Sequence, residues 1–165
     1  MHHTTLDLIE NKILTIDKLM PLVNIWRFLG KKIVFTNGCF DLLHLGHIDY
    51  LAKAADMGDK LIIGLNSDSS TSALKGPNRP ITDEKSRAHL IAALGFVSAV
   101  VLFDESTPFN LINTIKPDVL VKGADYTIDK IIGADIVLAH GGEVKTVEYI
   151  SGYSTTAIEN RIKNG

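Results

Sequence analysis

The sequence predicts an α/β fold, a doubly wound parallel sheet with helices on both faces. Three observations lead to this prediction. From residue 31 onward, short runs of β-branched, aromatic and other apolar residues alternate with segments of helical periodicity, and the connections are short. The apolar runs also lack polar interruptions, as expected for strands covered on both faces. The length of 165 residues suits one domain with a core of its own.

Residues 1–30 are predicted to be a helical extension that precedes a main domain of residues 31–165. Apolar residues from Leu6 to Leu29 recur roughly at helical spacing, Pro21 is expected to interrupt them, and Gly30 suits a helix end. We expect this segment to pack on the core or on a partner subunit, so a homo-oligomer is a reasonable expectation. His2 and His3 are assigned no role.

The elements of the main domain follow in a regular order. Strands are predicted over residues 33–35, 61–65, 97–103, 119–121 and 144–147, and helices over residues 45–57, 83–94, 108–116, 129–140 and 155–163. Thr82 is expected to cap the second of these helices, and Thr107-Pro108 to open the third. Residues 66–70 and 74–80 are predicted as loops. In a Rossmann-like sheet, ligands bind beyond the carboxyl ends of the strands, which selects loops 37–47, 66–79, 104–107 and 122–126.

Composition narrows the partners. The formal net charge of -2 gives no sign of a nucleic-acid surface. Cys39 is the single cysteine, which rules out an internal disulfide framework and favours a reducing, cytoplasmic setting. The amino terminus has no secretory pattern, and no apolar run is long enough to span a bilayer, so no membrane partner is expected.

The stretch from Phe35 to His47 is the strongest candidate for a site. A buried strand ends at the turn-forming Gly38, and a helix begins near residue 45. His44 and His47 share one face of the first helical turn, and Gly46 between them leaves the backbone open to a large ligand. Unpaired N–H groups at a helix start attract phosphate. The sequence therefore predicts the triphosphate site of a nucleotide.

Two other readings of the histidine pair stay open at this point. The histidines could be partly buried side chains with hydrogen-bond partners, or metal ligands together with Asp41 or Cys39. The commoner nucleotide motifs are missing, because the chain has neither G-x-x-x-x-G-K-[ST] nor G-x-G-x-x-G after the first strand. Asn66, rather than an acid, ends the second strand, which disfavours a hydride-transferring dinucleotide enzyme.

Several blocks in order resemble a known family. The residues Asn37-Gly-Cys-Phe-Asp-Leu-Leu-His-Leu-Gly-His resemble the signature of the cytidylyltransferase-like nucleotidyltransferases. The later blocks are Asn66-Ser-Asp-Ser-Ser, Leu74-Lys-Gly with Arg79-Pro80, Phe103-Asp-Glu-Ser-Thr-Pro, Lys116-Pro-Asp-Val-Leu-Val-Lys-Gly-Ala-Asp-Tyr and Gly152-Tyr-Ser-Thr-Thr. Together they resemble the adenylyltransferase half of bacterial bifunctional ADP-heptose synthases, from about residue 31 to the end. The sugar-kinase half is absent, so a separate sugar kinase is expected.

The resemblance implies that ATP and D-glycero-β-D-manno-heptose 1-phosphate, with Mg²⁺, give ADP-heptose and pyrophosphate, a step of lipopolysaccharide biosynthesis. A cytidylyltransferase acting on an alditol phosphate such as glycerol 3-phosphate is the first alternative. Such relatives usually carry an Arg before the Ser-Thr-Thr block, where this chain has Tyr149-Ile150-Ser151. A non-catalytic nucleotide-binding module is the second alternative, although it has no need of His44 and His47.

The resemblance also implies roles for particular residues. The catalytic residues would be His44, His47 and Lys75, and no metal ligand is assigned. Nucleotide and phosphate contacts are expected from Thr36, Asn37, Gly38, Phe40, Gly46, Lys122, Gly123, Gly152, Ser154, Thr155 and Thr156. Sugar-phosphate contacts are expected from Asp41, Arg79, Arg87 and Asp104. The competing interpretations are a turn brace for Asp41, turn formation for Asp104, a solvated basic loop for Lys75 and Arg79, a surface ion pair for Arg87, and a helix cap for Ser154.

Overall fold

The computed structural model describes residues 4–165, so His2 and His3 lie outside the described residues. Its single sheet holds β1 (Ile33–Gly38), β2 (Lys60–Asn66), β3 (Val97–Phe103), β4 (Val119–Gly123) and β5 (Glu143–Val147) in the order β3-β2-β1-β4-β5. All neighbouring strands are parallel. The strand order reverses at β1, which places the switch point between β1 and β4. The α/β, Rossmann-like prediction is confirmed.

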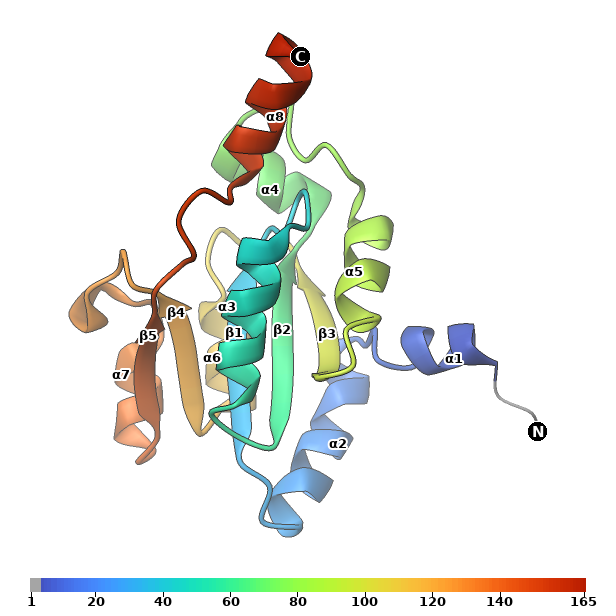
Figure 1. Ribbon diagram of the computed structural model, residues 1–165. Helices are drawn as coiled ribbons and strands as arrows, with labels where there is room; N and C mark the ends of the chain where they lie inside the picture. Colours follow the sequence, from blue (N-terminus) through green and yellow to red (C-terminus); the bar gives the residue numbers. More distant parts are fainter. Residues whose placement is uncertain (1–3) are drawn as a thin grey trace.

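Helices cover both faces of the sheet (Figure 1). They are α1 (Thr5–Glu10), α2 (Ile16–Phe28), α3 (Leu45–Ala55), α4 (Asp68–Lys75), α5 (Glu84–Ala92), α6 (Phe109–Ile115), the 3₁₀ turn η1 (Ile128–Lys130), α7 (Ala134–Ala139) and α8 (Thr155–Asn164). Side chains of α2, α6 and α7 share one buried cluster with the sheet, and side chains of α3 and α5 share the other. Within residues 4–165, no helix has the length and apolar content needed to cross a membrane.

The amino-terminal segment packs on the same core as the sheet. Leu19 and Val23 of α2 are fully buried beside Phe35 of β1. Ile13 forms an isolated parallel bridge with Val100 on the outer edge of β3. The expected interruption at Pro21 is wrong, because Pro21 lies inside α2. The helical segment breaks instead at residues 11–15, where the chain turns to meet β3.

Three other boundaries differ from the prediction. Residues 68–75 form α4 rather than a loop, because Ser67 caps the helix by accepting a hydrogen bond from the Ser70 N–H at 3.2 Å. Helix α5 is capped by Asp83, whose carboxylate accepts from the Ser86 N–H at 2.9 Å, and not by Thr82. The helix predicted over residues 129–140 is shorter, since α7 begins only at Ala134.

Candidate active site

His44 and His47 lie where β1 leads into α3, at the carboxyl edge of the sheet. His44 is the N-cap residue of α3 and has an extended backbone, and the His47 N–H donates to the His44 carbonyl at 2.9 Å. The two imidazole rings stack, with centroids 3.8 Å apart and an interplanar angle of 19°. The ring of Phe40 meets His47 edge-on at 5.3 Å. The predicted strand, turn and helix therefore bring both histidines to the start of α3.

Gly46 lies in a tight space, where a side chain would press on its neighbours. A Cβ atom on Gly46 would lie 3.1 Å from the His44 ring and 3.2 Å from Cβ of Tyr153, which precedes α8. The backbone of the first turn of α3 is therefore packed between the histidine pair and the carboxyl-terminal segment. This close approach brings the Gly152–Thr156 block next to the histidines, although the two segments are far apart in the sequence.

The histidine pair is neutral at pH 7. Burial lowers the pKa of His44, and burial together with the charges of His44 and Lys75 lowers the pKa of His47 to about 4. The Nδ1 atoms of both rings are buried without a hydrogen-bond partner in the described part of the chain. Buried nitrogen atoms normally find a partner, so these two Nδ1 atoms are an exception in the described part of the chain.

Lys75 and Lys122 approach the site from opposite sides of β1. Lys75 is the last residue of α4, which follows β2, and its positive charge contributes to the lowered pKa of His47. Lys122 lies near the end of β4, at the switch point, and its ammonium group donates to the Asn37 side chain. Burial lowers the pKa of Lys122 to about 8, against the opposing effect of Asp125. Lys122 and Asn37 therefore form a partly buried, positively charged contact between β1 and β4.

Thr36 and Gly123 are engaged with tyrosines that sequence reasoning did not select. The Thr36 hydroxyl lies 2.8 Å from the Tyr50 hydroxyl in a buried hydrogen bond, and burial raises the pKa of Tyr50. The Tyr50 ring stacks on Tyr149 at a centroid distance of 5.2 Å. A Cβ atom on Gly123 would collide with the Tyr149 ring, so only glycine leaves room for it. Tyr50 follows His47 by three residues on α3, and that spacing was the available signal.

Asp41 braces the segment that follows α4. One of its carboxylate oxygens accepts from the Ile81 and Thr82 N–H groups at 2.7 and 3.0 Å, and the other accepts from Arg79. Burial acts to raise the pKa of Asp41, but these hydrogen bonds outweigh it and hold the pKa below its usual range. Arg79 also pairs with Glu159 of α8 at 2.9 Å. The polar groups of Arg79 and Asp41 thus have hydrogen-bond or ion-pair partners within the protein.

Arg87 is fully buried, so the expectation of a surface ion pair is wrong about its exposure. Its guanidinium donates to the carbonyls of Cys39 and Asn66 at 2.6 and 2.8 Å, and to that of Thr82 at 3.0 Å. It also pairs with the half-exposed carboxylate of Asp68 at 2.8 Å. These bonds tie the loop after β1 to the end of β2 and the start of α5.

Two remaining groups of predicted residues lie at the ends of helices. Asp104 is exposed and accepts from the Ser69 hydroxyl at 3.2 Å, next to the start of α4. Ser154 caps α8 by accepting from the Ala157 N–H at 3.1 Å, which confirms the cap interpretation. Thr155 and Thr156 form the first turn of α8, and Gly152 has the positive φ of 86° that favours glycine.

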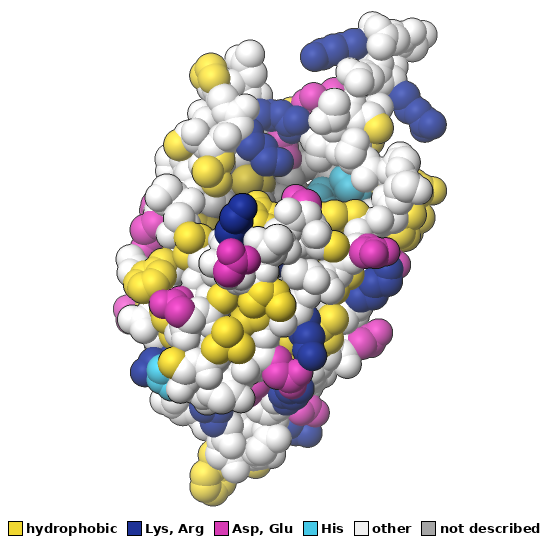
Figure 2. All heavy atoms as spheres, turned by 90° about the vertical axis from the view of Figure 1, so that its left-hand side faces the viewer, with side chains coloured by type: hydrophobic (Ala, Val, Ile, Leu, Met, Phe, Trp, Pro, Cys, Tyr) yellow, Lys and Arg dark blue, Asp and Glu magenta, His cyan; other side chains and the backbone are white. Residues whose placement is uncertain are grey.

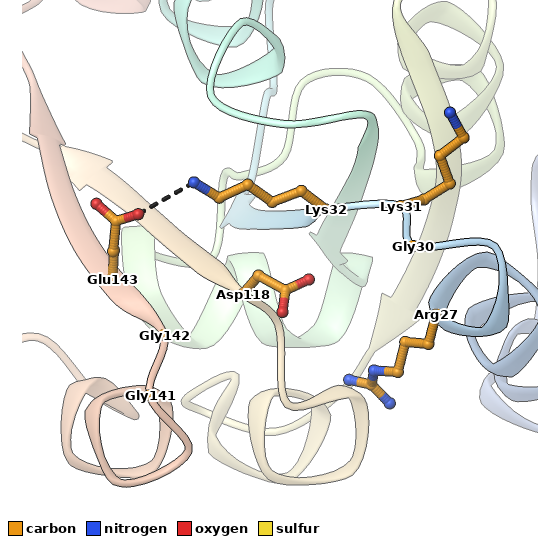
Figure 3. A pocket seen from close by; sticks show the side chains of 8 residues that line it. All are labelled: Arg27, Gly30, Lys31, Lys32, Asp118, Gly141, Gly142 and Glu143. Carbon is orange, nitrogen blue, oxygen red and sulfur yellow. Dashed lines mark hydrogen bonds and ion pairs between the residues drawn. The ribbon is translucent and has the colours of Figure 1, made fainter.

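Two open cavities lie away from this site. The one in Figure 3, of about 450 Å³, is lined by Arg27, Lys31, Lys32, Asp118 and Glu143 with neighbouring glycines. It sits at the amino ends of β1, β4 and β5, where Lys32 pairs with Glu143 at 3.0 Å. The other, of about 430 Å³, lies along the outer edge of β3 beside residues 13–16. Parallel α/β sheets bind ligands at the opposite, carboxyl end, so the histidine edge is the candidate site.

The described part of the chain offers no ready-made metal site. Residues 4–165 contain no cluster of three or more His, Cys, Asp or Glu side chains that could hold a metal ion. Asp41, the acid nearest to the histidines in sequence, already accepts hydrogen bonds at both carboxylate oxygens. A metal ion at this edge would therefore take most of its ligands from a bound phosphate chain and water, as Mg²⁺ commonly does.

A parallel sheet with its switch point at β1, and a histidine pair at a helix start on that edge, define a nucleotide-binding α/β domain. Comparison with known families makes this assignment more specific. The chain belongs to the cytidylyltransferase-like family, whose model matches residues 35–161, and it is a nucleotidyltransferase. The resemblance found in the sequence is therefore confirmed.

Similar proteins fall in the same group. The bifunctional protein HldE of Paramagnetospirillum magneticum is 53% identical over 94% of this chain, and that of Geobacter metallireducens is 53% identical over 93%. The chain spans about a third, 32% and 31%, of the length of these relatives. It matches their carboxyl-terminal adenylyltransferase half.

Solved structures agree with this assignment. A lipopolysaccharide core biosynthesis protein from Thermoplasma volcanium is 35% identical with a TM-score of 0.58, and the match covers 76% of this chain and all of that one. Pantoate-β-alanine ligase from Francisella tularensis, solved with β-γ ATP and β-alanine, has a TM-score of 0.57 over 92% of this chain and 76% of its own. At 15% identity it shows the shared fold alone.

Proposed function

We propose that this protein transfers AMP from ATP to D-glycero-β-D-manno-heptose 1-phosphate and releases pyrophosphate. The observation that carries the proposal is the stacked pair His44 and His47 at the start of α3, on the switch-point edge of a nucleotidyltransferase fold. Over 94% of its length, this chain is 53% identical to a bifunctional protein, HldE, with a heptose-directed adenylyltransferase half, which supports the choice of acceptor.

The reaction is a direct in-line displacement. A phosphate oxygen of the heptose 1-phosphate attacks the α-phosphorus, a new P–O bond forms, and the bond to the β-phosphate oxygen breaks as pyrophosphate leaves. The attacking oxygen is already ionised, so no general base and no covalent intermediate are required. The protein has to align the reactants and stabilise the charge on the phosphates.

The residues that would stabilise that charge surround the histidine pair. His44 and His47 are neutral and would donate N–H groups to the ATP phosphates, together with the backbone N–H groups at the start of α3. Lys75 would add positive charge from the β2 side, and Lys122 from the β4 side. The Ser154–Thr156 turn at the start of α8 would bind a further phosphate. Mg²⁺ would enter with ATP and neutralise the phosphate oxygens.

The proposed reaction also implies a source for the substrate and a use for the product. A separate sugar kinase would supply the heptose 1-phosphate, and the ADP-heptose product would serve lipopolysaccharide biosynthesis in the cytoplasm. Self-association through the amino-terminal helices is part of this proposal, and sedimentation of the purified protein measures it directly.

A substrate panel tests the proposed reaction. The protein is incubated with Mg²⁺, each nucleoside triphosphate in turn and a set of sugar and alditol phosphates, and pyrophosphate release is followed. We expect release with ATP and heptose 1-phosphate. Release with CTP and glycerol 3-phosphate instead would establish the cytidylyltransferase alternative. Tight ATP binding with no turnover on any acceptor would establish a non-catalytic nucleotide-binding module.

A further inference from the structure

Helix α8 and the segment from Gly76 to Thr82 approach the histidine edge from different parts of the chain. In Figure 1, α8 lies beyond the carboxyl ends of the strands. Figure 2 shows that the molecule is hollowed at this end, with histidine side chains inside the hollow. The two segments are connected by the side chain of Arg79.

Arg79 is shared between a buried and a half-buried carboxylate. One guanidinium nitrogen donates to Asp41, whose side chain is 0% exposed, and another lies 2.9 Å from Glu159 of α8. The side chain of Arg79 is itself 16% exposed, against 23% for Glu159. A partly buried pair of this kind is screened less by solvent than an ordinary surface pair. Arg79 therefore ties α8 to the loop that precedes the histidines.

Helix α8 has little else to hold it in place. None of its residues is buried. The segment that precedes it is anchored by Tyr149, which stacks on Tyr50, and by Tyr153, which lies against Gly46. Within residues 4–165, the ion pair of Glu159 with Arg79 joins α8 to the rest of the chain. A helix without buried side chains is expected to open easily when such a contact is lost.

We propose that Arg79 is a positioning residue that holds α8, and with it the Ser154–Thr156 turn, over the histidine pair through Glu159. This replaces the sequence-based expectation that Arg79 binds the sugar phosphate. The role assigned to the Ser154–Thr156 turn rests on the proposed function, in which that turn binds ATP. The consequence is that Glu159, which touches no substrate, controls the affinity for ATP.

The test compares Glu159→Gln with the wild type. The substitution keeps the size of the side chain and the pairing of Arg79 with Asp41, and it removes the charge that holds α8. We expect the Kd for Mg·ATP to rise roughly fivefold, as for the loss of about 1 kcal/mol from one ion pair. Amide hydrogen exchange over residues 155–164 should accelerate, while the KM for heptose 1-phosphate and kcat stay within about twofold.

A matched control lies on the same helix. Lys163 is exposed, and Lys163→Gln should leave both the Kd for Mg·ATP and the exchange rates unchanged. High salt gives a second readout, because about 1 M salt shortens the screening length to roughly 3 Å and should bring the wild type toward the variant. The salt response of Glu159→Gln should be the smaller of the two.

Two results would overturn this inference. If Glu159→Gln changes neither ATP affinity nor exchange in α8, the ion pair does not position the helix. If Arg79→Gln raises the KM for heptose 1-phosphate while Glu159→Gln has no effect, Arg79 contacts the acceptor instead. ATP binding and exchange are measured without any acceptor. A protein that is inactive with heptose 1-phosphate would therefore contradict the proposed function while leaving this test intact.

Discussion

The proposed chemistry depends most directly on the imidazole groups of His44 and His47. They are stacked, neutral and short of hydrogen-bond partners at Nδ1. We expect His47→Ala to lower kcat/KM by roughly 100- to 1000-fold, as for the loss of one preorganised donor to the transition state. The rate of pyrophosphate release measures this effect.

The control for His47→Ala is a histidine outside the site. His140 is exposed and bonds to the Ile136 carbonyl of its own helix, so His140→Ala should keep wild-type turnover. Unchanged turnover in His47→Ala, with an unchanged circular dichroism spectrum, would mean that His47 has only a structural role.

The buried state of His47 also predicts how stability depends on pH. The folded protein keeps the pKa of His47 at about 4, whereas the ordinary value is 6.5. Between these values the unfolded chain binds a proton that the folded chain does not, so stability falls as the pH drops from 6.5 toward 4. We expect the urea midpoint to fall less over this range in His47→Gln than in the wild type. Protonation of carboxylates such as Asp41 also destabilises both proteins at acid pH. If the urea midpoints of the two proteins fall in parallel with pH, the low pKa of His47 is contradicted.

A substitution at Gly46 should change ATP binding without a large change in stability. In Gly46→Ala, the new Cβ atom would meet the His44 ring and Tyr153 at 3.1 and 3.2 Å, which displaces both by a few tenths of an ångström. Alanine also favours a helix by about 1 kcal/mol relative to glycine, which offsets that strain. We expect the free energy of unfolding to change by no more than about 1 kcal/mol, while the Kd for Mg·ATP, measured by calorimetry, rises. An unchanged Kd would show that the backbone at Gly46 is not approached by ATP.

At the scale of elements, Arg87 joins three segments from inside the fold. Its guanidinium satisfies the carbonyls of Cys39, Asn66 and Thr82 and pairs with Asp68. Arg87→Met should cost about 3 kcal/mol in the free energy of unfolding, because buried carbonyls lose their donors. Urea denaturation measures this loss, and the exposed Arg161→Met serves as the control. A loss of turnover at unchanged stability would instead favour the sequence-based expectation that Arg87 binds the sugar phosphate.

Local patterns were enough to predict the elements that carry the site. The strand ending at Gly38, the helix starting at Leu45 and the shared face of His44 and His47 all follow from residues within one strand–turn–helix unit. Helix α4 was missed because Asp68-Ser-Ser-Thr-Ser is poor in apolar residues, and its stability depends on the cap at Ser67 and on packing against β2.

The sequence could not predict which group each charged side chain bonds to, because these partners come together only in the folded chain. In the sequence, Arg79, Arg87 and Lys75 are all cations near the predicted phosphate site. In the fold, however, both arginines are surrounded by hydrogen-bond acceptors of the protein. Glu159 lies 80 positions after Arg79, and no local spacing relates the two residues. The contact between Lys122 and Asn37 likewise exists only because β4 pairs with β1.

At the scale of the whole molecule, the sheet order decides which charged side chains lie at the histidine edge. Lys75 follows β2 and Lys122 ends β4, so the two lysines flank β1 from opposite sides. The arginines instead hold the loops and α8 that shape the same edge. Under the proposed function, the lysines would neutralise phosphate charge, whereas the arginines are bonded to the protein's own carboxylates and carbonyls. This arrangement also explains why a chain with a net charge of -2 can present a local anion site.

The amino-terminal segment offers the last prediction, because it tests where the folding unit begins. Leu19 and Val23 are fully buried against the sheet, and Ile13 extends the edge of β3. Burial of each such side chain is worth about 1.5–3 kcal/mol, against a total stability of about 5–15 kcal/mol for a domain. Deleting residues 1–30 should therefore abolish a cooperative urea transition. Deleting only residues 1–8, which carry the exposed Leu6 and Leu8, should leave the transition in place. A cooperative transition in the protein that begins at residue 31 would show that the segment is a dispensable extension.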